Sequence, residues 1–202
     1  MSKFLCVVIM ALISQPLMAK SIVVLGDSIS AGYGIEVAQG WVALMQKKID
    51  DTHKDFTIHN ASISGDTSSG GLARVDALLT LHKPTILILE LGANDGLRGL
   101  SPALMKSNLS EIIRRARAQQ ANTKVLLLGI KIPPNYGKRY IDAFYNVYPQ
   151  LAQEMNIPVI PFLLEDIALD TGLMQPDGLH PNAKAQPLIT EKIWQQLLPL
   201  LN

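Results

Sequence analysis

Cysteine is nearly absent from this sequence of 202 residues, since it occurs only once, as Cys6. Cys6 lies in an N-terminal segment that we expect to be removed, so the mature chain has no thiol. Such a chain can form no disulfide and cannot be a cysteine hydrolase, and its stability has to come from its core. The length and a hydrophobic fraction of 48% suit one globular domain with a substantial core.

An excess of either charge is missing as well. The chain has 18 basic and 17 acidic residues, which gives a formal net charge of +1. The densest basic group, Arg114, Arg115 and Arg117, has the spacing of a solvated helix face. Since nucleic acid is bound through a concentrated basic surface, the sequence predicts no nucleic acid partner.

A hydrophobic run long enough to cross a membrane is also lacking. The apolar stretch Phe4–Ile13 is shorter than the roughly 20 residues that a spanning helix needs. Lys3 precedes this stretch and Ala19 follows it, which is the order of a secretory signal peptide. We predict a signal peptide over 1–19, and a mature domain over 20–202 that is periplasmic or secreted and keeps no stable membrane anchor. An uncleaved anchor is the alternative.

Apolar runs of strand length recur along the rest of the chain, at 22–25, 56–59, 85–91, 124–130 and 157–162. The third and fourth runs are continuous rather than alternating, which is typical of strands covered on both faces. Segments with helical spacing separate the runs and follow the last one; they contain Trp41–Ile49, Leu72–Leu79, Leu104–Ala116, Phe144–Met155 and residues 184–200. This alternation predicts a three-layer α/β/α sandwich around a five-stranded parallel sheet.

Small polar segments follow several of the predicted strands. In open parallel sheets, ligands bind outside the carboxyl ends of the strands, so these segments are expected to meet at one edge. They are Gly26-Asp27-Ser28, the stretch 60–67, Gly92-Ala93-Asn94-Asp95-Gly96 and, before the last helix, Asp177-Gly178-Leu179-His180.

The residues of these segments fit the requirements of acyl transfer. A serine hydroxyl is a weak nucleophile until a base accepts its proton, and His180 can accept the proton of Ser28. Asp177 lies three residues before His180 and can fix the orientation of the imidazole. The negative oxygen of a tetrahedral intermediate needs donors, for which the backbone N–H groups of Ser28 and Gly65 and the side-chain amide of Asn94 are candidates.

Together these blocks resemble the SGNH, or GDSL-like, hydrolases, whose name records the four residues matched by Ser28, Gly65, Asn94 and His180. Ile29 stands where the family's GDSL motif has leucine. The stretches 60–67 and 95–99 are similar to the branch of periplasmic acyl-CoA thioesterases/lysophospholipases and bacterial arylesterases. The resemblance implies a flavodoxin-like fold, which agrees with the predicted sandwich.

Substrate-binding residues are less clearly marked. Leu97 and Leu100 follow the Asn94 block, and Ile132 and Tyr136 follow the fourth strand, where they are candidates to line an apolar groove for an acyl or aryl group. The alternative is that they only cap the core. The loop 96–100 resembles an element that moves over acyl chains in the family branch, and its glycines can serve as hinges.

The preferred hypothesis is therefore an exported serine esterase, monomeric and without metal or cofactor. Its expected partners are small-molecule esters and thioesters: aryl esters, short- to medium-chain acyl esters, lysophospholipids and acyl-CoA. A carbohydrate O-deacetylase on the same scaffold is one alternative, although 5% aromatic residues offer few sugar-stacking surfaces. A metal-dependent or binding-only flavodoxin-like domain is another, since Asp27, Asp66, Asp95 and His180 could gather an ion. Local bracing of loops is the favoured interpretation of these aspartates.

Overall fold

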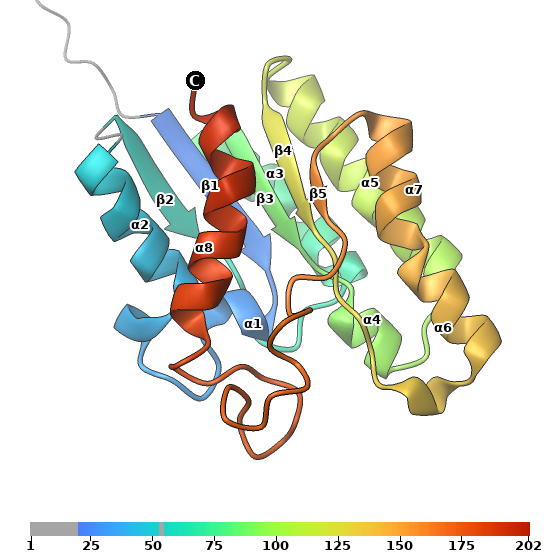
Figure 1. Cartoon of the computed structure of the whole chain (residues 1–202). Coiled ribbons are helices and arrows are strands. Elements are labelled where there is room, and N and C mark those ends of the chain that lie inside the picture. Colours follow the sequence, from blue (N-terminus) through green and yellow to red (C-terminus); the bar gives the residue numbers. More distant parts are fainter. Residues whose placement is uncertain (1–19, 53–54) are drawn as a thin grey trace, which may run out of the picture.

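A computed structural model describes residues 20–52 and 55–202 of the chain (Figure 1). The predicted signal peptide, residues 1–19, lies outside the described residues. Five strands form one sheet in the order β2-β1-β3-β4-β5, and each neighbouring pair is parallel. The strands are β1 (Lys20–Gly26), β2 (Phe56–Asn60), β3 (Ile86–Glu90), β4 (Lys124–Leu128) and β5 (Val159–Ile160). The predicted five-stranded parallel sheet is confirmed.

The central strands are buried along nearly their whole length. Every residue of β3 is buried, and in β1 only Lys20 is exposed. Such strands need an apolar side chain on both faces, which explains why their sequences do not alternate. The one charged residue inside this buried region of β3 is Glu90, at its carboxyl end.

Helices cover both faces of the sheet. The helix α2 packs against α8 on one face, in front of the sheet in Figure 1, while α3, α5 and α7 pack side by side on the other. The helices are α1 (Ser28–Ala31), α2 (Trp41–Thr52), α3 (Ser68–His82), α4 (Ala93–Leu97), α5 (Pro102–Gln119), α6 (Lys138–Tyr145), α7 (Val147–Met155) and α8 (Gln186–Leu197). Short 3₁₀ turns are η1 (Val37–Gln39), η2 (Pro134–Tyr136) and η3 (Leu198–Leu200).

Prolines interrupt two elements that the sequence predicted to be longer, and the last helix also ends earlier than predicted. The expected strand 157–162 is reduced to β5, because Pro158 and Pro161 flank it and cannot donate to a ladder. The expected helix over Phe144–Met155 is split into α6 and α7 at Asn146, since Pro149 has no N–H for the carbonyl of Tyr145. The last helix ends at Leu197, and η3 follows it.

Two short helices that the sequence did not predict begin at the carboxyl edge of the sheet. The helix α1 follows β1 after one residue, and α4 follows β3 after two. Because Gly26 of β1 and Glu90 of β3 are register partners, α1 and α4 start next to each other. Within the described ranges, no helix is both long and apolar enough to cross a membrane.

Candidate active site

Ser28 is the first residue of α1, two residues beyond the end of β1 at Gly26. The Asp27 side chain caps the helix, since its Oδ1 accepts from the backbone N–H of Ile29 at 3.1 Å. Gly32 ends the helix with a φ of 75°, in the left-handed region that favours glycine. This single turn presents the Ser28 side chain, which is partly buried, at the carboxyl edge of the sheet.

His180 lies against Ser28 although it belongs to the loop before α8. Its Nε2 is 2.9 Å from Ser28 Oγ, and its Nδ1 is 2.7 Å from Asp177 Oδ2. The other oxygen of Asp177 accepts from the backbone N–H groups of Leu179 at 2.9 Å and His180 at 3.0 Å. The structure thus brings the three predicted catalytic residues into one continuous hydrogen-bonded series.

The ionisation of Asp177 suits this series. Burial raises the pKa of the carboxyl. Hydrogen bonds from the His180 side chain and from the backbone of His180 and Leu179 lower it by more, so that the pKa falls to about 2. Asp177 is therefore a carboxylate at neutral pH and accepts from the imidazole.

Tyr33 forms an aromatic wall beside His180, and sequence reasoning gave it no role. The two ring centroids are 4.5 Å apart and the rings are tilted by 39°. Gln175 holds the backbone here, because its Nε2 donates to the carbonyls of Tyr33 at 2.7 Å and Pro181 at 3.1 Å. Tyr33 remains 53% exposed, so it is accessible to a ligand beside His180.

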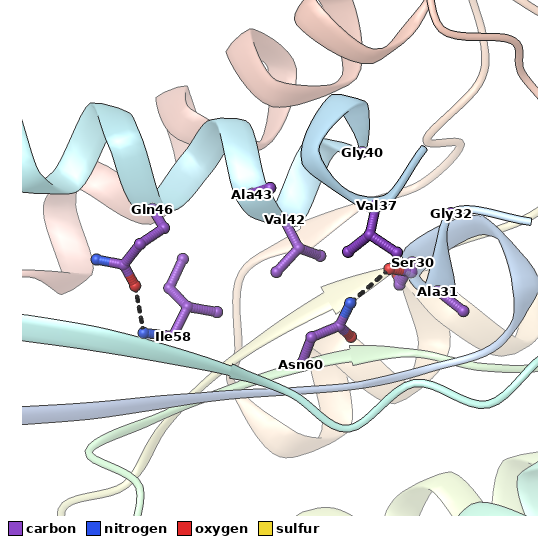
Figure 2. Close-up of a pocket in the computed structure, with 10 residues that line it drawn as sticks. All are labelled: Ser30, Ala31, Gly32, Val37, Gly40, Val42, Ala43, Gln46, Ile58 and Asn60. Atoms are coloured by element: carbon purple, nitrogen blue, oxygen red, sulfur yellow. Dashed lines mark hydrogen bonds between the residues drawn. The ribbon is translucent and has the colours of Figure 1, made fainter. Parts of the chain in front are cut away.

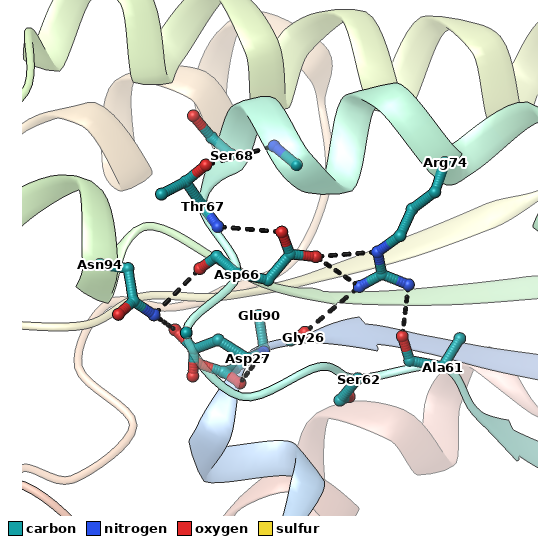
Figure 3. Close-up of polar contacts among 12 residues, drawn as sticks. Gly26, Asp27, Ala61, Ser62, Asp66, Thr67, Ser68, Arg74, Glu90 and Asn94 are labelled. Atoms are coloured by element: carbon teal, nitrogen blue, oxygen red, sulfur yellow. Dashed lines mark hydrogen bonds and ion pairs between the residues drawn. The ribbon is translucent and has the colours of Figure 1, made fainter.

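The segments that carry the predicted oxyanion donors are tied together by hydrogen bonds, and Figure 3 shows those between Asn94, Asp27 and Asp66. Asn94 Nδ2 donates to the carbonyl of Asp66 at 2.9 Å and to Asp27 Oδ2 at 3.3 Å. Arg98 Nη2 donates to the carbonyl of Gly65 at 2.9 Å. The side-chain amide nitrogen of Asn94 carries two hydrogens, and the two acceptors engage both of them. An oxyanion would therefore have to replace either Asp66 or Asp27 as the acceptor.

Three aspartates next to the proposed site residues, Asp27, Asp66 and Asp95, brace the loops of the site. Asp66 Oδ2 accepts from Arg74 Nε at 2.8 Å, and Asp95 accepts from Ser68 through its backbone N–H at 2.8 Å and its hydroxyl at 2.6 Å. With the cap that Asp27 provides, this is the bracing that the sequence favoured. Across residues 20–52 and 55–202, no cluster of three or more His, Cys, Asp or Glu side chains suited to a metal ion is present.

A buried carboxyl pair lies under the nucleophile turn, and the sequence-based prediction did not include it. Asp27 and Glu90 are both 0% exposed. Burial is the main cause that raises the pKa of Asp27 to about 6, and burial followed by the charge of Asp27 raises the pKa of Glu90 well above its ordinary value. The available signal was a lone acidic residue in a continuous apolar strand, because such a charge is costly to bury.

Two of the four candidate substrate-binding residues lie at the end of α4, where Leu97 is its last residue and Leu100 belongs to the loop that follows. Tyrosine hydroxyls hold this loop: Tyr136 donates to the carbonyl of Leu97 at 2.8 Å and Tyr140 to that of Leu100 at 2.7 Å. Tyr136 and Tyr140 also line an open hollow of about 500 Å³, together with Pro102, Gly137, Lys138, Arg139 and Ala143.

Ile132, the remaining candidate, is only 4% exposed and belongs to the hydrophobic core. It packs behind α4, where a Cβ added to Gly96 would lie 2.5 Å from Ile132 Cγ2. Its burial argues against a substrate-lining role and favours the alternative that it caps the core.

A second hollow, of about 180 Å³, lies between α1, η1, α2 and β2 (Figure 2). At its rim, Asn60 Nδ2 donates to the carbonyl of Ser30 at 2.8 Å, which ties the end of β2 to the nucleophile helix. The lining residues are Ser30, Ala31, Gly32, Val37, Gly40, Val42, Ala43, Gln46, Ile58 and Asn60.

Known proteins resemble this chain over nearly its whole length. The model of the GDSL-like Lipase/Acylhydrolase family matches residues 24–187. Esterase TesA of Pseudomonas aeruginosa is 50% identical over 192 residues, which cover 95% of this chain and 94% of that protein. Thioesterase 1/protease 1/lysophospholipase L1 of Escherichia coli K12 is 45% identical over 184 residues, covering 91% and 86%.

A solved structure agrees with these sequence matches. The psychrotrophic esterase EstA from Pseudoalteromonas, inhibited by monoethylphosphonate, superposes with a TM-score of 0.85 at 44% identity, covering 91% of this chain and 99% of that one. The chain therefore belongs to the GDSL-like lipase/acylhydrolase, or SGNH, family, and it is an ester-hydrolysing enzyme.

Proposed function

We propose that this enzyme is an exported serine esterase that hydrolyses carboxylic esters and thioesters through Ser28, His180 and Asp177. The observation that carries the proposal is the 2.9 Å contact between Ser28 Oγ and His180 Nε2, continued by the 2.7 Å contact between His180 Nδ1 and Asp177. This series supplies a nucleophile, a base and a group that fixes the base.

In the acylation step, Ser28 Oγ attacks the acyl carbon while its proton passes to His180 Nε2. The electron pair of the carbonyl moves onto its oxygen, where the N–H groups of Ser28 and Gly65 and the amide of Asn94 stabilise the charge. Collapse of this intermediate breaks the bond to the alkoxide or thiolate, which leaves with the proton of His180. The acyl group stays on Ser28.

Water completes the reaction. His180 takes a proton from the water, whose oxygen attacks the acyl-enzyme and forms a second tetrahedral intermediate. When the Ser28–acyl bond breaks, the proton returns from His180 to Ser28 Oγ and the carboxylic acid is released. Asp177 keeps its negative charge throughout and stabilises the imidazolium that forms twice.

The proposed substrates are aryl esters, short- to medium-chain acyl esters, lysophospholipids and acyl-CoA. Relatives named esterase and thioesterase/lysophospholipase support this range. The exposed Tyr33 and Leu100 offer apolar contacts to a substrate. Apolar contacts discriminate weakly between similar acyl groups, so we expect a broad substrate range. The sequence of residues 1–19 supports export to the periplasm or beyond.

A serine-directed fluorophosphonate tests the nucleophile, by analogy with the phosphonate inhibition of the related esterase. Covalent labelling should map to Ser28 by peptide mass spectrometry and should persist in the presence of a chelator. Labelling elsewhere, or activity lost on chelation, would overturn the proposed mechanism. Rates on an aryl acetate, a long-chain acyl-CoA, a lysophospholipid and an acetylated sugar then rank the substrate classes, and a marked preference for the sugar would support the O-deacetylase instead.

A further inference from the structure

Glu90 lies directly beside the nucleophile turn, and its side chain is hydrogen-bonded to Asp27 and Ser30 rather than to Ser28, His180 or Asp177. Its Oε2 accepts from the backbone N–H of Asp27 at 3.2 Å and from Ser30 Oγ at 2.8 Å. These two donors flank Ser28, one on each side along the chain. A single carboxyl oxygen from β3 therefore ties together both ends of the short segment that carries the nucleophile.

The fit between Glu90 and this turn is close. Gly26 has no side chain at the point of approach, where an added Cβ would lie 2.8 Å from Glu90 Oε2 and 2.8 Å from Ser30 Cβ. Any larger residue at 26 would push Glu90 away from the turn. The glycine of the Gly-Asp-Ser sequence is thus explained by the carboxyl behind it.

The environment of Glu90 contains no compensating cation among the described residues. It is fully buried, its neighbour Asp27 is a second buried carboxyl, and its Oε1 has no hydrogen-bond partner. The hydroxyl of Tyr148, which donates to the carbonyl of Leu91 at 3.1 Å, also faces this pair. Because two adjacent buried carboxyls cannot both stay ionised, one of them holds a proton at neutral pH. Both oxygens of Asp27 accept hydrogen bonds, from Ile29 and Asn94, so Asp27 is the better stabilised carboxylate and Glu90 holds the proton.

We infer that Glu90 is a positioning residue for ester hydrolysis, and that as an uncharged carboxylic acid it fixes Ser28 against His180 by holding Asp27 and Ser30. This inference rests on the proposed role of Ser28 as nucleophile. Glu90 touches no reacting atom, so its effect has to be transmitted through the backbone of Asp27 and the side chain of Ser30.

The same contacts reach the proposed oxyanion site. Asp27 Oδ2 accepts from the amide of Asn94, and Asp27 Oδ1 caps α1. A shift of Asp27 would therefore move Ser28 and release Asn94 together. An apolar residue at 90 could fill the same space, but it would leave the N–H of Asp27 and the hydroxyl of Ser30 without their acceptor.

The test compares Glu90→Leu, Glu90→Gln and Ser30→Ala with the wild type. Thr123→Val is the matched control. Thr123 is also buried and donates one hydrogen bond, to the carbonyl of Pro84 at 3.0 Å. It lies just before β4, at the amino ends of the strands and away from the proposed site. For each variant, kcat and KM on an aryl acetate, the rate of fluorophosphonate labelling at Ser28 and the Tm are measured.

Glu90→Leu should lower kcat and the labelling rate by roughly 10- to 100-fold with little change in KM, because misplacement of a reacting group by about 1 Å costs rate rather than binding. Glu90→Gln should restore most of that loss, since an uncharged amide keeps the acceptor oxygen. Thr123→Val should lower the Tm alone. If Glu90→Leu does not fold, Ser30→Ala decides, with an expected loss of kcat at unchanged KM.

Wild-type labelling in Glu90→Leu, or wild-type kcat in Ser30→Ala where the leucine variant does not fold, would overturn the inference. Equal losses in Glu90→Gln and Glu90→Leu would overturn the uncharged-acid role. These results are distinct from a failure of the proposed function, which would appear as retained turnover in Ser28→Ala.

Discussion

His180 Nε2 lies 2.9 Å from Ser28 Oγ, although the two residues are 152 positions apart in the chain. The parallel sheet makes this contact possible, because β1 delivers Ser28 to its carboxyl edge and the loop before α8 returns to the same edge.

Replacement of Ser28 by alanine should abolish ester turnover and leave the fold intact. The change removes the nucleophile but only one side-chain oxygen, so kcat should fall by at least about 10³-fold, as expected when a covalent route is lost. Steady-state assays on an aryl acetate measure the loss, and an unchanged circular dichroism spectrum with a similar Tm is the control. Substantial residual turnover would refute Ser28 as the nucleophile.

Asp177→Asn should keep the geometry of the loop and still reduce kcat strongly. An amide at this position can accept from only one oxygen and cannot hold the imidazole in the tautomer that accepts a proton at Nε2, a defect that costs up to about 10⁴-fold in comparable triads. Steady-state assays on an aryl acetate measure the loss, with an unchanged circular dichroism spectrum as the control. A kcat close to that of the wild type would contradict the role of Asp177.

The buried Asp27 carboxyl should make the folded state less stable as pH rises from about 4 to about 6. Its pKa is raised from 3.8 to about 6 in the folded protein, mainly by burial, so the folded state binds this proton more tightly than the unfolded state. The stabilisation is complete below the unfolded pKa and is lost as pH rises through the folded one.

Urea unfolding of the wild type and of Asp27→Asn at pH 4 and pH 7 measures this effect. Asparagine imitates the protonated form and does not titrate. The stability of Asp27→Asn, compared with that of the wild type, should therefore be higher at pH 7 than at pH 4. Groups that are not coupled to Asp27, such as Asp177, cancel in this comparison because both proteins contain them. An equal difference at both pH values would exclude a raised pKa for Asp27.

The ring of Tyr33 should favour aryl over alkyl leaving groups. An aromatic contact contributes about 0.5–1.5 kcal/mol, so Tyr33→Leu should lower kcat/KM for an aryl acetate by roughly 2- to 10-fold relative to an alkyl acetate. Tyr33→Phe keeps the ring and should keep the preference, which makes it the matched control. If the leucine variant loses both activities equally, Tyr33 acts on His180 and not on the substrate.

Local patterns were sufficient to predict the sheet. Continuous apolar runs predicted strands buried on both faces, and β3 and β4 lie within the two longest of them. The ends of the elements were less certain, because prolines at 149, 158 and 161 act through single backbone N–H groups that a periodicity does not register.

Site residues differ in how far a sequence can identify them. Ser28, Asn94, Asp177 and His180 carry reactive or polar side chains in short segments after strands or before the last helix, so the family motifs mark them. Tyr33 and Glu90 escaped because their significance depends on a partner far along the chain: Tyr33 lies against His180, and Glu90 accepts from Ser30. The role of Ile132 was predicted wrongly for the converse reason, since its burial comes from core packing against Gly96 of α4, which lies far along the chain.

By itself, the sequence determined the order of strands and helices, the edge at which chemistry is expected and the residue types available there, because these follow from local periodicity and from short motifs. The tertiary structure alone decided that Glu90 and Asp27 share a buried pocket, that both hydrogens of the Asn94 amide are engaged and that the loop after α4 is tied by two tyrosine hydroxyls. The physical reason is that hydrogen bonds and desolvation act over a few ångströms in space, between groups whose separation along the chain leaves no periodic signal.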